Sequence, residues 1–444
     1  MNPFFQYKKL CEIAKRVKRK IELVPTETYR TLGCKLYGEG VYQREEKKGI
    51  EILAKNMYLV KENDLVFNRI WAQKGSVGIV PQEISGSIVT SDFPVYEFDM
   101  NQIYPKYIGW YVKTIDFWEE CKQHSYGTSG RQRLSPKELP NIKFPIYDFK
   151  IQKKIVAFIE NKVNIIKKIE YNKQIIENEV ETLWNNSVIK AFKGNKYEKK
   201  FDSAHSILDE QSKVYSKHDL SRYNNAHPWK PHIYEKGLYS IPDNWIWTDV
   251  GSTLTHIVDC VNDTPFFSEY PTDYLGLKST NIRPFFLDLS KKWYVSKDDY
   301  LYWNRRETPM EGDLILTREA PMGNSCILPA DLNVCLTQRL LLMRNNEKFV
   351  SNRYLLHYLN SSIFYDQVIE HSRGLTTPHL RVKDLPKILI PLCPKPHQES
   401  IVKQLDNLFD SVQKIRSHNS EIKNMLDKLI PSILNEGVFH EFMK

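Results

Sequence analysis

Residues 139–184 read LPNIKFPIYDFKIQKKIVAFIENKVNIIKKIEYNKQIIENEVETLW, and residues 385–430 read LPKILIPLCPKPHQESIVKQLDNLFDSVQKIRSHNSEIKNMLDKLI. Both stretches begin with Leu-Pro, continue to a second Pro, and then reach a Gln that is followed by an Ile-Val pair. Beyond the Gln, apolar side chains recur in steps of four and three, the spacing of a helix that buries one seam. This motif predicts two similar units, each a domain followed by a long helix.

The repeat extends upstream of both helices. Asp64-Leu65-Val66-Phe67-Asn68-Arg69 matches Asp313-Leu314-Ile315-Leu316-Thr317-Arg318, and Tyr107 matches Tyr354. From Leu134, which matches Leu380, the offset stays constant, so residues 60–192 recur over 309–438. Chance similarity in a chain rich in Lys and Ile is the alternative. A repeat this long indicates a duplicated domain pair that presents two similar surfaces to one partner.

The two helices share one predicted seam. In the first helix it carries Ile155, Ile159, Lys162, Ile166, Ile169, Lys173, Ile176, Val180, Leu183 and Ser187. In the second it carries Ile401, Leu405, Leu408, Val412, Ile415, Asn419, Ile422, Leu426, Leu429 and Ile433. A single polar residue in an apolar seam fixes register and partner. We expect the helices to pair as an antiparallel coiled coil whose register Lys173 and Asn419 set. The alternative is that each helix packs only on its own domain and leaves this residue exposed.

The helices separate segments of different character. The segments before them mix short β-branched runs with Gly, Pro and Asn, which is typical of α/β (α+β) domains with many loops. We expect one helix from Tyr104 to Cys121 and its counterpart from Arg353 to His371, and Pro431 should end or kink the second long helix. The expected layout is a first domain over 1–149, a helix over 150–193, a linker with little structure over 194–235, a second domain over 236–396 and a helix over 397–444.

Composition describes a globular chain with a modest basic excess. Of 444 residues 41% are hydrophobic, which is ample for packed cores, and 63 basic against 54 acidic residues give a net charge of +9. This balance tilts the partner toward a polyanion. The seven cysteines form no Cys-x-x-Cys pair, which argues against a disulfide framework or a zinc site and fits a reducing cytoplasm. No apolar run is long enough to span a membrane, and no signal-peptide pattern is present.

This combination of duplicated variable domains and long helices resembles the DNA specificity subunit of type I restriction-modification enzymes. The signatures are Leu139-Pro140 to Pro145 with Gln152-Lys153-Lys154-Ile155-Val156, and Leu385-Pro386 to Pro391 with Gln398-Glu399-Ser400-Ile401-Val402. Ile241-Pro242-Asp243-Asn244-Trp245 and Lys278-Ser279-Thr280-Asn281-Ile282 also resemble motifs of that family's target recognition domains. In the first copy the corresponding motifs are blurred and read Phe4-Phe5 and Leu32-Gly33-Cys34-Lys35.

The resemblance implies a non-catalytic subunit of a prokaryotic cytoplasmic complex. Each target recognition domain would bind half of a split site on double-stranded DNA. The paired helices would dock two methyltransferase subunits, and the restriction and translocase subunits would join through them. No cofactor or metal is implied. Two other classes stay open, namely a nuclease or methyltransferase with an unrecognised site, and an adaptor whose coiled coil and domains bind proteins.

The motifs of catalysis are missing from the sequence. No Gly-x-x-x-x-Gly-Lys-Ser/Thr loop is present, which argues against ATP hydrolysis. Asn2-Pro3-Phe4-Phe5 lacks the second Pro of an amino-methyltransferase motif, and Glu421-Ile422-Lys423 lies on the seam helix. The sequence therefore favours DNA recognition over chemistry.

Candidate DNA contacts fall in loops that hold Arg, Lys, Gln and hydroxyl residues, the side chains that bind bases and phosphates. A basic run, Lys15-Arg16-Val17-Lys18-Arg19-Lys20, has two interpretations, a phosphate clamp or the solvated face of a helix. Arg69 and Arg318 occupy equivalent positions, so a structural or phosphate role is favoured over base reading, whereas the loop residues that differ between copies are better candidates for discrimination. The candidate set is Arg69, Lys74, Ser129, Arg131, Gln132, Arg133, Arg318, Arg373, Thr376, Thr377 and His379.

Overall fold

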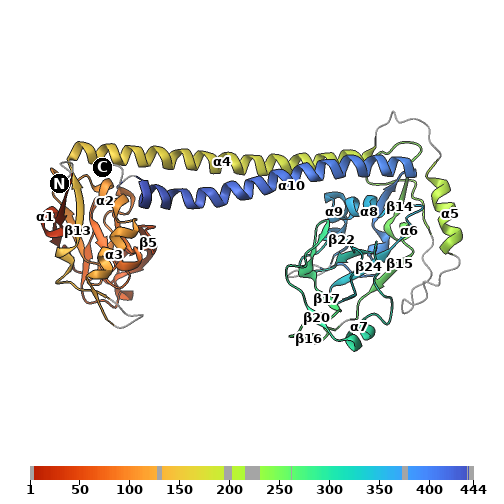
Figure 1. Ribbon diagram of the computed structural model, residues 1–444, viewed down its shortest axis with the longest axis horizontal. Helices are drawn as coiled ribbons and strands as arrows, with labels where there is room; N and C mark the ends of the chain where they lie inside the picture. The colour runs from red at the N-terminus through yellow and green to blue at the C-terminus, as the bar shows by residue number, and fades with distance from the viewer. Residues whose placement is uncertain are drawn as a thin grey trace. The chain divides into compact units, whose positions relative to one another are not determined.

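The computed structural model describes residues 5–127, 133–194, 203–215, 231–261, 263–372, 379–437 and 439. It divides into two compact units, one of Met1–Gln174 with His418–Lys444 and one of Ile175–Ser417. The long helices α4 (Phe149–Lys193) and α10 (Lys395–Ser432) each contribute one half to each unit. Each unit therefore contains one mixed domain and parts of both helices (Figure 1).

The first domain is built from short strands. These are β1 (Phe5–Lys9), β2 (Ala14–Val17), β3 (Lys20–Ile21), β4 (Thr28–Cys34), β5 (Val41–Lys48), β6 (Met57–Leu59), β7 (Leu65–Phe67), β8 (Val77–Ile79), β9 (Ile88–Thr90), β10 (Val95–Phe98), β11 (Ser125–Tyr126), β12 (Arg133–Leu134) and β13 (Lys143–Tyr147). Its helices are α1 (Leu10–Ile13), α2 (Pro105–Tyr111) and α3 (Ile115–Gln123), with 3-10 turns η1 (Gly49–Glu51), η2 (Ala72–Lys74), η3 (Gln82–Ile84) and η4 (Leu139–Asn141). The larger sheets have the orders β2-β10-β7-β8 and β3-β6-β9-β4-β5, and β1 pairs with β13.

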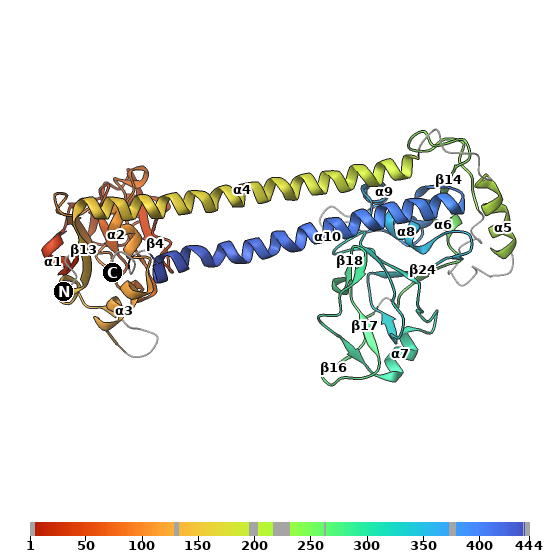
Figure 2. The same cartoon turned by 45° about the horizontal axis from the view of Figure 1, so that its top comes forward.

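The second domain uses a similar set of elements. Its strands are β14 (Ile246–Asp249), β15 (His256–Asp259), β16 (Phe267–Ser268), β17 (Leu275–Leu277), β18 (Ile282–Arg283), β19 (Phe286–Leu287), β20 (Tyr294–Val295), β21 (Leu314–Thr317), β22 (Ser325–Ile327), β23 (Val334–Leu336), β24 (Leu340–Arg344) and β25 (Leu389–Leu392). Its helices are α6 (Val250–Thr253), α7 (Lys297–Trp303), α8 (Asn352–Leu359) and α9 (Ser362–His371), with 3-10 turns η6 (Ser279–Asn281) and η7 (Leu385–Lys387). Figure 1 shows α8 and α9 between α10 and strands β22 and β24 of this domain, and Figure 2 shows the same domain turned, with β17, β18 and α7 in view.

The two domains share the order of one sheet and the pairing of their outer strands, although their other large sheets differ, β3-β6-β9-β4-β5 in the first and β16-β20-β17-β23 in the second. The sheet β15-β24-β21-β22 has the order of β2-β10-β7-β8, and β14 pairs with β25 as β1 pairs with β13. In each copy one pair of strands is parallel, β4 with β9 and β17 with β23. Individual contacts repeat as well, because the Tyr107 hydroxyl donates to the Pro145 carbonyl at 2.6 Å and the Tyr354 hydroxyl donates to the Pro391 carbonyl at 2.5 Å. The duplicated mixed fold predicted from the sequence is confirmed.

The single helix predicted over Tyr104–Cys121, and its counterpart over Arg353–His371, are wrong, because each stretch forms two helices. In the first domain α2 ends before Thr114, whose hydroxyl caps α3 by accepting from the Phe117 N–H. In the second, Ser361 caps α9 through the Phe364 N–H in the same way. A hydroxyl that satisfies the first free N–H groups of a helix favours a new start at that point. The apolar spacing continued across the break and hid it.

Within the second unit the long helices pack against each other and run antiparallel. Trp184 of α4 contacts Phe409 of α10, with 5.7 Å between ring centroids, and Arg416 pairs with Glu181. The predicted seam contains two rows of residues, and only one of them is buried. Ile159, Ile166 and Val180 are buried, whereas Lys162, Ile169, Ile176 and Leu183 are exposed. On α10, Val412, Asn419 and Leu426 are buried and Ile415 and Leu429 are exposed.

The exposed row follows from two adjacent apolar stripes on α4. Both stripes have the steps of a seam, and the sequence cannot say which faces α10. The structure buries Trp184 instead of Leu183, because the larger ring fills the space between Phe409 and Phe285. This leaves Phe158, Ile165, Ile169, Ile176 and Leu183 on the outer stripe, each 38% exposed or more.

The end of each long helix inserts a Phe into a domain. Phe192 of α4 contacts Tyr354 and Tyr358, each at 5.1 Å between centroids, in the second unit. In the first unit Phe439 contacts the equivalent residues Tyr107 and Tyr111 at 5.8 and 5.5 Å. The constant offset between the copies would match Val438, not Phe439, with Phe192. After Pro431, however, the chain forms the π-helical turn η8 (Ile433–Gly437), which holds one residue more than an α-helical turn. Phe439 therefore takes the position equivalent to Phe192. Both domains therefore receive the same aromatic anchor.

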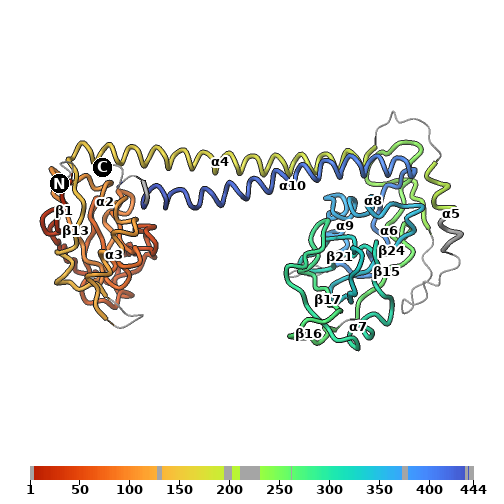
Figure 3. The backbone as a smooth tube through the Cα atoms, viewed as in Figure 1, coloured from red at the N-terminus to blue at the C-terminus, as the bar shows by residue number. Residues whose placement is uncertain are grey.

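Two further segments differ from expectation. Helix α5 (His205–Tyr215) lies within the stretch expected to have little structure, and Ala204 and Leu208 are buried in the core of the second unit (Figure 3). The basic run after Cys11 is not a helix face, since Ala14–Val17 is a strand paired antiparallel with β10. Among the described residues, no helix is long and apolar enough to cross a membrane.

Candidate nucleic-acid interface

Arg69 lies where β7 meets the hairpin β11–β12. Its carbonyl accepts from the Leu134 N–H at 2.8 Å, and its Nε donates to the Leu134 carbonyl at 3.3 Å. The guanidinium is 3.7 Å from the carboxylate of Asp92, and 21% of the Arg69 side chain is exposed. The two predicted segments, one after β7 and one that ends at β12, therefore lie side by side.

Arg318 repeats this arrangement in the second domain. Its carbonyl accepts from the Leu380 N–H at 3.1 Å, and its guanidinium is 3.3 Å from Asp259. Burial raises the pKa of Asp259 above its ordinary value, although Arg318 and Arg306 act in the opposite direction. Since 18% of the Arg318 side chain is exposed, both equivalent arginines are largely occupied in holding the loops.

The strands that lead into these loops rest on two buried carboxylates. Asp64 and Asp313 are each 2% exposed and begin the matched Asp-Leu strands. Arg19 donates to Asp64 through both terminal nitrogens, and Arg344 donates to Asp313 at 2.7 Å through Nε. A buried carboxylate is costly unless paired, so each arginine is part of its domain's framework. Sequence inspection missed these partners because Arg19 lies between β2 and β3 in the first copy, whereas Arg344 ends β24 in the second.

Three other candidates are described. Lys74 is exposed and stacks its ammonium 5.0 Å from the Trp71 ring centroid. Arg133 is exposed on β12, opposite Tyr126 in the hairpin, and η2, which holds Lys74, lies against this strand. His379 is half-buried, next to the Leu380 that bonds Arg318. The structure thus brings Arg69, Lys74 and Arg133 to one edge of the first domain.

The remaining candidates lie outside the described residues. These are Ser129, Arg131, Gln132, Arg373, Thr376 and Thr377. Both loops singled out for base discrimination belong to this set, so their roles stay predictions from the sequence.

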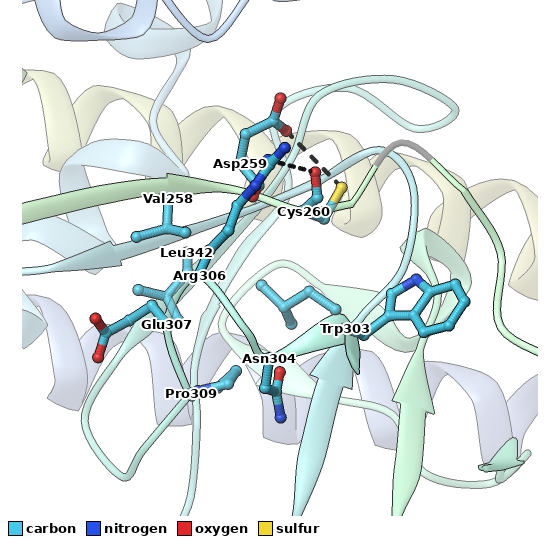
Figure 4. A pocket seen from close by; sticks show the side chains of 10 residues that line it. Val258, Asp259, Cys260, Trp303, Asn304, Arg306, Glu307, Pro309 and Leu342 are labelled. Carbon is cyan, nitrogen blue, oxygen red and sulfur yellow. Dashed lines mark hydrogen bonds between the residues drawn. The ribbon is translucent and has the colours of Figure 1, made fainter. Parts of the chain in front are cut away.

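A small pocket lies beside Asp259, the residue that pairs with Arg318. Figure 4 shows Asp259, Cys260, Trp303 and Arg306 around it, and the Arg306 Nη1 donates to the Cys260 carbonyl at 3.1 Å. The space open to a water centre is about 10 Å³, room for about one water molecule. Over the described part of the chain, no group of three or more His, Cys, Asp or Glu is placed to hold a metal ion. The pocket is too small to bind a substrate.

Comparison with known proteins points to one family. Residues 263–424 match the model of the type I restriction modification DNA specificity domain. The specificity subunits of the type I restriction enzymes EcoAI and EcoBI of Escherichia coli are 26% and 23% identical over 197 and 148 residues, or 43% and 33% of this chain. These alignments cover 32% and 31% of the two relatives, so the chain spans about a third of the length of the curated relatives it matches.

Two solved structures share the fold over nearly the whole chain. One, described as the structural basis of complex assembly and conformational transition of the type I R-M system, has a TM-score of 0.64 and 14% identity, with 98% of both chains covered. The other, the HsdS subunit of Thermoanaerobacter tengcongensis, has a TM-score of 0.56 and 14% identity, with 98% of this chain and 97% of that chain covered. Residues 263–424, in the second half of the chain, are therefore similar to a type I restriction modification DNA specificity domain, and the chain as a whole shares its fold with these two solved structures.

Proposed function

We propose that this chain is the non-catalytic DNA-recognition subunit of a type I restriction-modification complex. Each domain binds one half of a bipartite target on double-stranded DNA, for adenine methylation or for cleavage of foreign DNA. The observation that carries the proposal is the duplication of a whole domain-and-helix unit, one copy of which matches the specificity domain. The seven free cysteines, six of them buried, suit a prokaryotic cytoplasm.

The residues in and around the duplicated loops fall into two groups, one for phosphate contacts and one for base contacts. Arg69 and Arg318 hold equivalent loops through paired carboxylates, while Lys74 and Arg133 present exposed positive charge at the edge of the first domain. Phosphate contacts position a protein on DNA, and contacts to base edges specify the sequence. We assign base reading to the loop residues that differ between the copies, Arg131, Gln132, Thr377 and His379, and DNA binding without a specified role to Ser129, Arg373 and Thr376.

The outer stripe of α4 is the proposed docking surface for the methyltransferase subunits, one for each half of the chain. Phe158, Ile165 and Ile169 lie on the half of α4 in the first unit, and Ile176 and Leu183 lie on the half in the second. Within the first unit these residues are spaced by seven and four, and within the second by seven, so on each half of α4 a helix of one partner subunit could cover them as a seam. The restriction and translocase subunits would join through the methyltransferase.

The function is tested by mapping adenine methylation genome-wide in cells that express the methyltransferase with and without this chain. We expect a split motif that depends on the chain, one half of which changes when either domain is exchanged. If the methyltransferase is active and no motif depends on the chain, the proposal fails and a protein-binding adaptor is favoured instead. Within the motif, Arg131→Ala should alter one half only, whereas equal weakening on all DNA would make it a phosphate contact.

The docking surface is tested by Ile169→Lys and Ile176→Lys, each measured by co-purification with the methyltransferase subunits. A Lys inside an apolar contact is left unpaired and desolvated, so each variant should lose the methyltransferase subunit that docks on its own half of α4. Asn164→Lys, at an exposed position of the same helix outside the outer stripe, is the matched control and should keep it. Retention of the methyltransferase by all three variants would place the contact elsewhere.

A further inference from the structure

Each domain contains a strand that ends in Leu-Gly-x-Lys. In the second domain Leu275–Leu277 form β17, and Lys278 follows directly. A Cβ on Gly276 would lie 3.0 Å from the Phe267 ring, closer than side chains normally pack. The glycine therefore lets the Phe267 ring lie across the strand, next to the lysine.

Lys278 and a second lysine gather on one indole ring. The Nζ of Lys278 lies 3.2 Å from the Trp293 ring centroid and 4.1 Å from that of Phe267. The Nζ of Lys291 lies 4.3 Å from the same Trp293 centroid. Because both Nζ atoms lie this close to the Trp293 centroid, the two ammonium groups are near each other. This cluster of Lys278, Lys291, Trp293 and Phe267 is called the lysine pair below.

The buried side chain of Asn281 fixes the backbones that carry both lysines. Its Oδ1 accepts from the Lys278 N–H at 3.0 Å, and its Nδ2 donates to the Lys291 carbonyl at 3.0 Å. Asn281 is 3% exposed, so these bonds are shielded from water. The two charges are brought together by the fold and do not depend on flexible side chains alone.

The lysine pair has no anionic partner in the part of the chain that the structure describes. No ion pair with a carboxylate is formed by Lys278 or Lys291 there, although carboxylates pair with many other basic residues of this domain. Burial, and then the charge of Lys291, lower the pKa of Lys278 from its ordinary value. Two like charges held close together are destabilising by themselves and are relieved by a bound anion.

The first domain provides an internal comparison. There the segment reads Leu32-Gly33-Cys34-Lys35, and a Cβ on Gly33 would lie 2.8 Å from the Tyr42 ring. The Nζ of Lys35 lies 5.8 Å from that ring centroid, but it also pairs with Glu39 at 3.2 Å. The same lysine position is therefore neutralised in one domain and left without a described counter-ion in the other.

We propose that Lys278 and Lys291 together bind a backbone phosphate of the DNA half-site that the second domain reads, with Trp293 and Phe267 positioning the Lys278 ammonium. The inference rests on the proposed function and adds to it a phosphate contact in one half of the site only. Such a contact strengthens binding to every sequence and fixes the register of the domain without reading a base.

The test is the salt dependence of binding to a labelled random-sequence DNA duplex by the assembled complex, measured by fluorescence anisotropy. Each neutralised phosphate contributes about 0.9 to the slope of log K against log salt. Lys278→Gln and Lys291→Gln should each weaken binding and should lower this slope, by about 1 when combined. Lys348→Gln is the matched control, since Lys348 lies 5.4 Å from the Phe349 ring in the same domain without a second lysine.

The two proposals fail in different ways. If the unaltered complex binds DNA and the double variant keeps its slope and affinity, the phosphate contact is overturned and the recognition function stands. If the unaltered complex binds no DNA, both fail. Loss of the methyltransferase subunits without a change in slope would make the lysine pair a protein contact and would also overturn the inference. Lys35→Gln should change the slope less than Lys278→Gln, and an equal effect would contradict the difference drawn between the domains.

Discussion

The Nε2 of Gln152 donates a 2.8 Å hydrogen bond to the carbonyl oxygen of Tyr147, which joins the first turn of α4 to the end of β13. The same side chain bonds the Gln102 carbonyl and accepts from the Tyr104 N–H at 2.9 Å. Gln398 repeats all three bonds in the second unit, with Cys393, Phe349 and Ser351. Both Gln side chains are fully buried, so each fastens its domain to the helix that follows.

Replacing Gln398 by Leu should destabilise the second unit. The change leaves three buried backbone groups without partners, at about 1–3 kcal/mol for each. The loss in the free energy of unfolding is measured by urea unfolding, with hydrogen exchange of the amides of α8 and α10 as the readout. Lys403→Ala, at an exposed position of the same helix, should change the free energy of unfolding by less than about 0.5 kcal/mol. Equal stability of the two variants would contradict the assigned role.

The aromatic anchors at the helix ends predict a crossed pattern of local stability. Phe439→Ala should expose the amides around Tyr107 and Tyr111 to hydrogen exchange, and Phe192→Ala should expose those around Tyr354 and Tyr358. Truncation of a buried Phe costs about 3–5 kcal/mol. Each variant serves as the control for the other, because the two contacts lie in different units. Loss of protection in both domains from either change would show that the anchors do not act locally.

Lys173 and Asn419 remain our prediction for the residues that set the helix register. Asn419 is 5% exposed and its Nδ2 has no hydrogen-bond partner among the described residues, while Lys173 is half-buried. Replacing both by Ile should remove a cost in stability and yield a stable protein that mispairs or aggregates, as judged by light scattering after size-exclusion chromatography. Lys168→Ile with Ser420→Ile, both at exposed positions, controls for added apolar surface. Unchanged oligomeric state and DNA-binding geometry in the seam variant would refute the prediction.

His357 should make the second unit less stable in mild acid. Burial lowers its pKa below the ordinary value of 6.5 and outweighs the hydrogen bond to Asp406, which acts to raise it. Its Nδ1 is buried and has no hydrogen-bond partner in the part of the chain that the structure describes, so the neutral form is favoured. Burial alone would raise the pKa of Asp406, but hydrogen bonds from Arg353 and His357 hold it low, so that group matters only in stronger acid.

Proton uptake by His357 in the unfolded chain decides whether stability rises or falls with pH. Below about pH 6.5 the unfolded chain binds a proton that the folded His357 does not, so the free energy of unfolding falls as the pH falls. Urea unfolding of the second unit between about pH 7 and about pH 5 measures this. His357→Gln keeps a donor toward Asp406 without titrating and should flatten the dependence. An unchanged pH profile in that variant would assign the effect to another group.

Thiol labelling should modify one cysteine in the native protein. All seven cysteines are free, and Cys11 is exposed while the others are buried. Burial raises the pKa of the Cys326 and Cys335 thiols to about 12, which suppresses the reactive thiolate. Mass spectrometry should find one label per chain, none in Cys11→Ser, and seven after unfolding. Several labels on the native protein would contradict the burial.

The sequence by itself determined the duplication, the two long helices and the pairs of equivalent residues. Gln152 could be matched with Gln398 because the offset between the copies is constant from Leu134 onward, and Tyr107 could be matched with Tyr354 because its offset differs by one residue. Their hydrogen bonds then repeat as expected from one fold used twice. Composition likewise pointed to a polyanionic partner, but it could not assign single residues to DNA.

Only the tertiary structure decided which face of each element is covered. On α4 two apolar stripes share the same spacing, and the packing of Trp184 against Phe409 selects the one that faces α10. The pairing of charges is also absent from the sequence, since Arg69 and Lys278 are both basic residues that follow a short apolar strand, yet Arg69 pairs with Asp92 and Lys278 lies on the same indole ring as a second lysine. Periodicity records which residues share a face, whereas burial and pairing depend on what the rest of the chain brings against it.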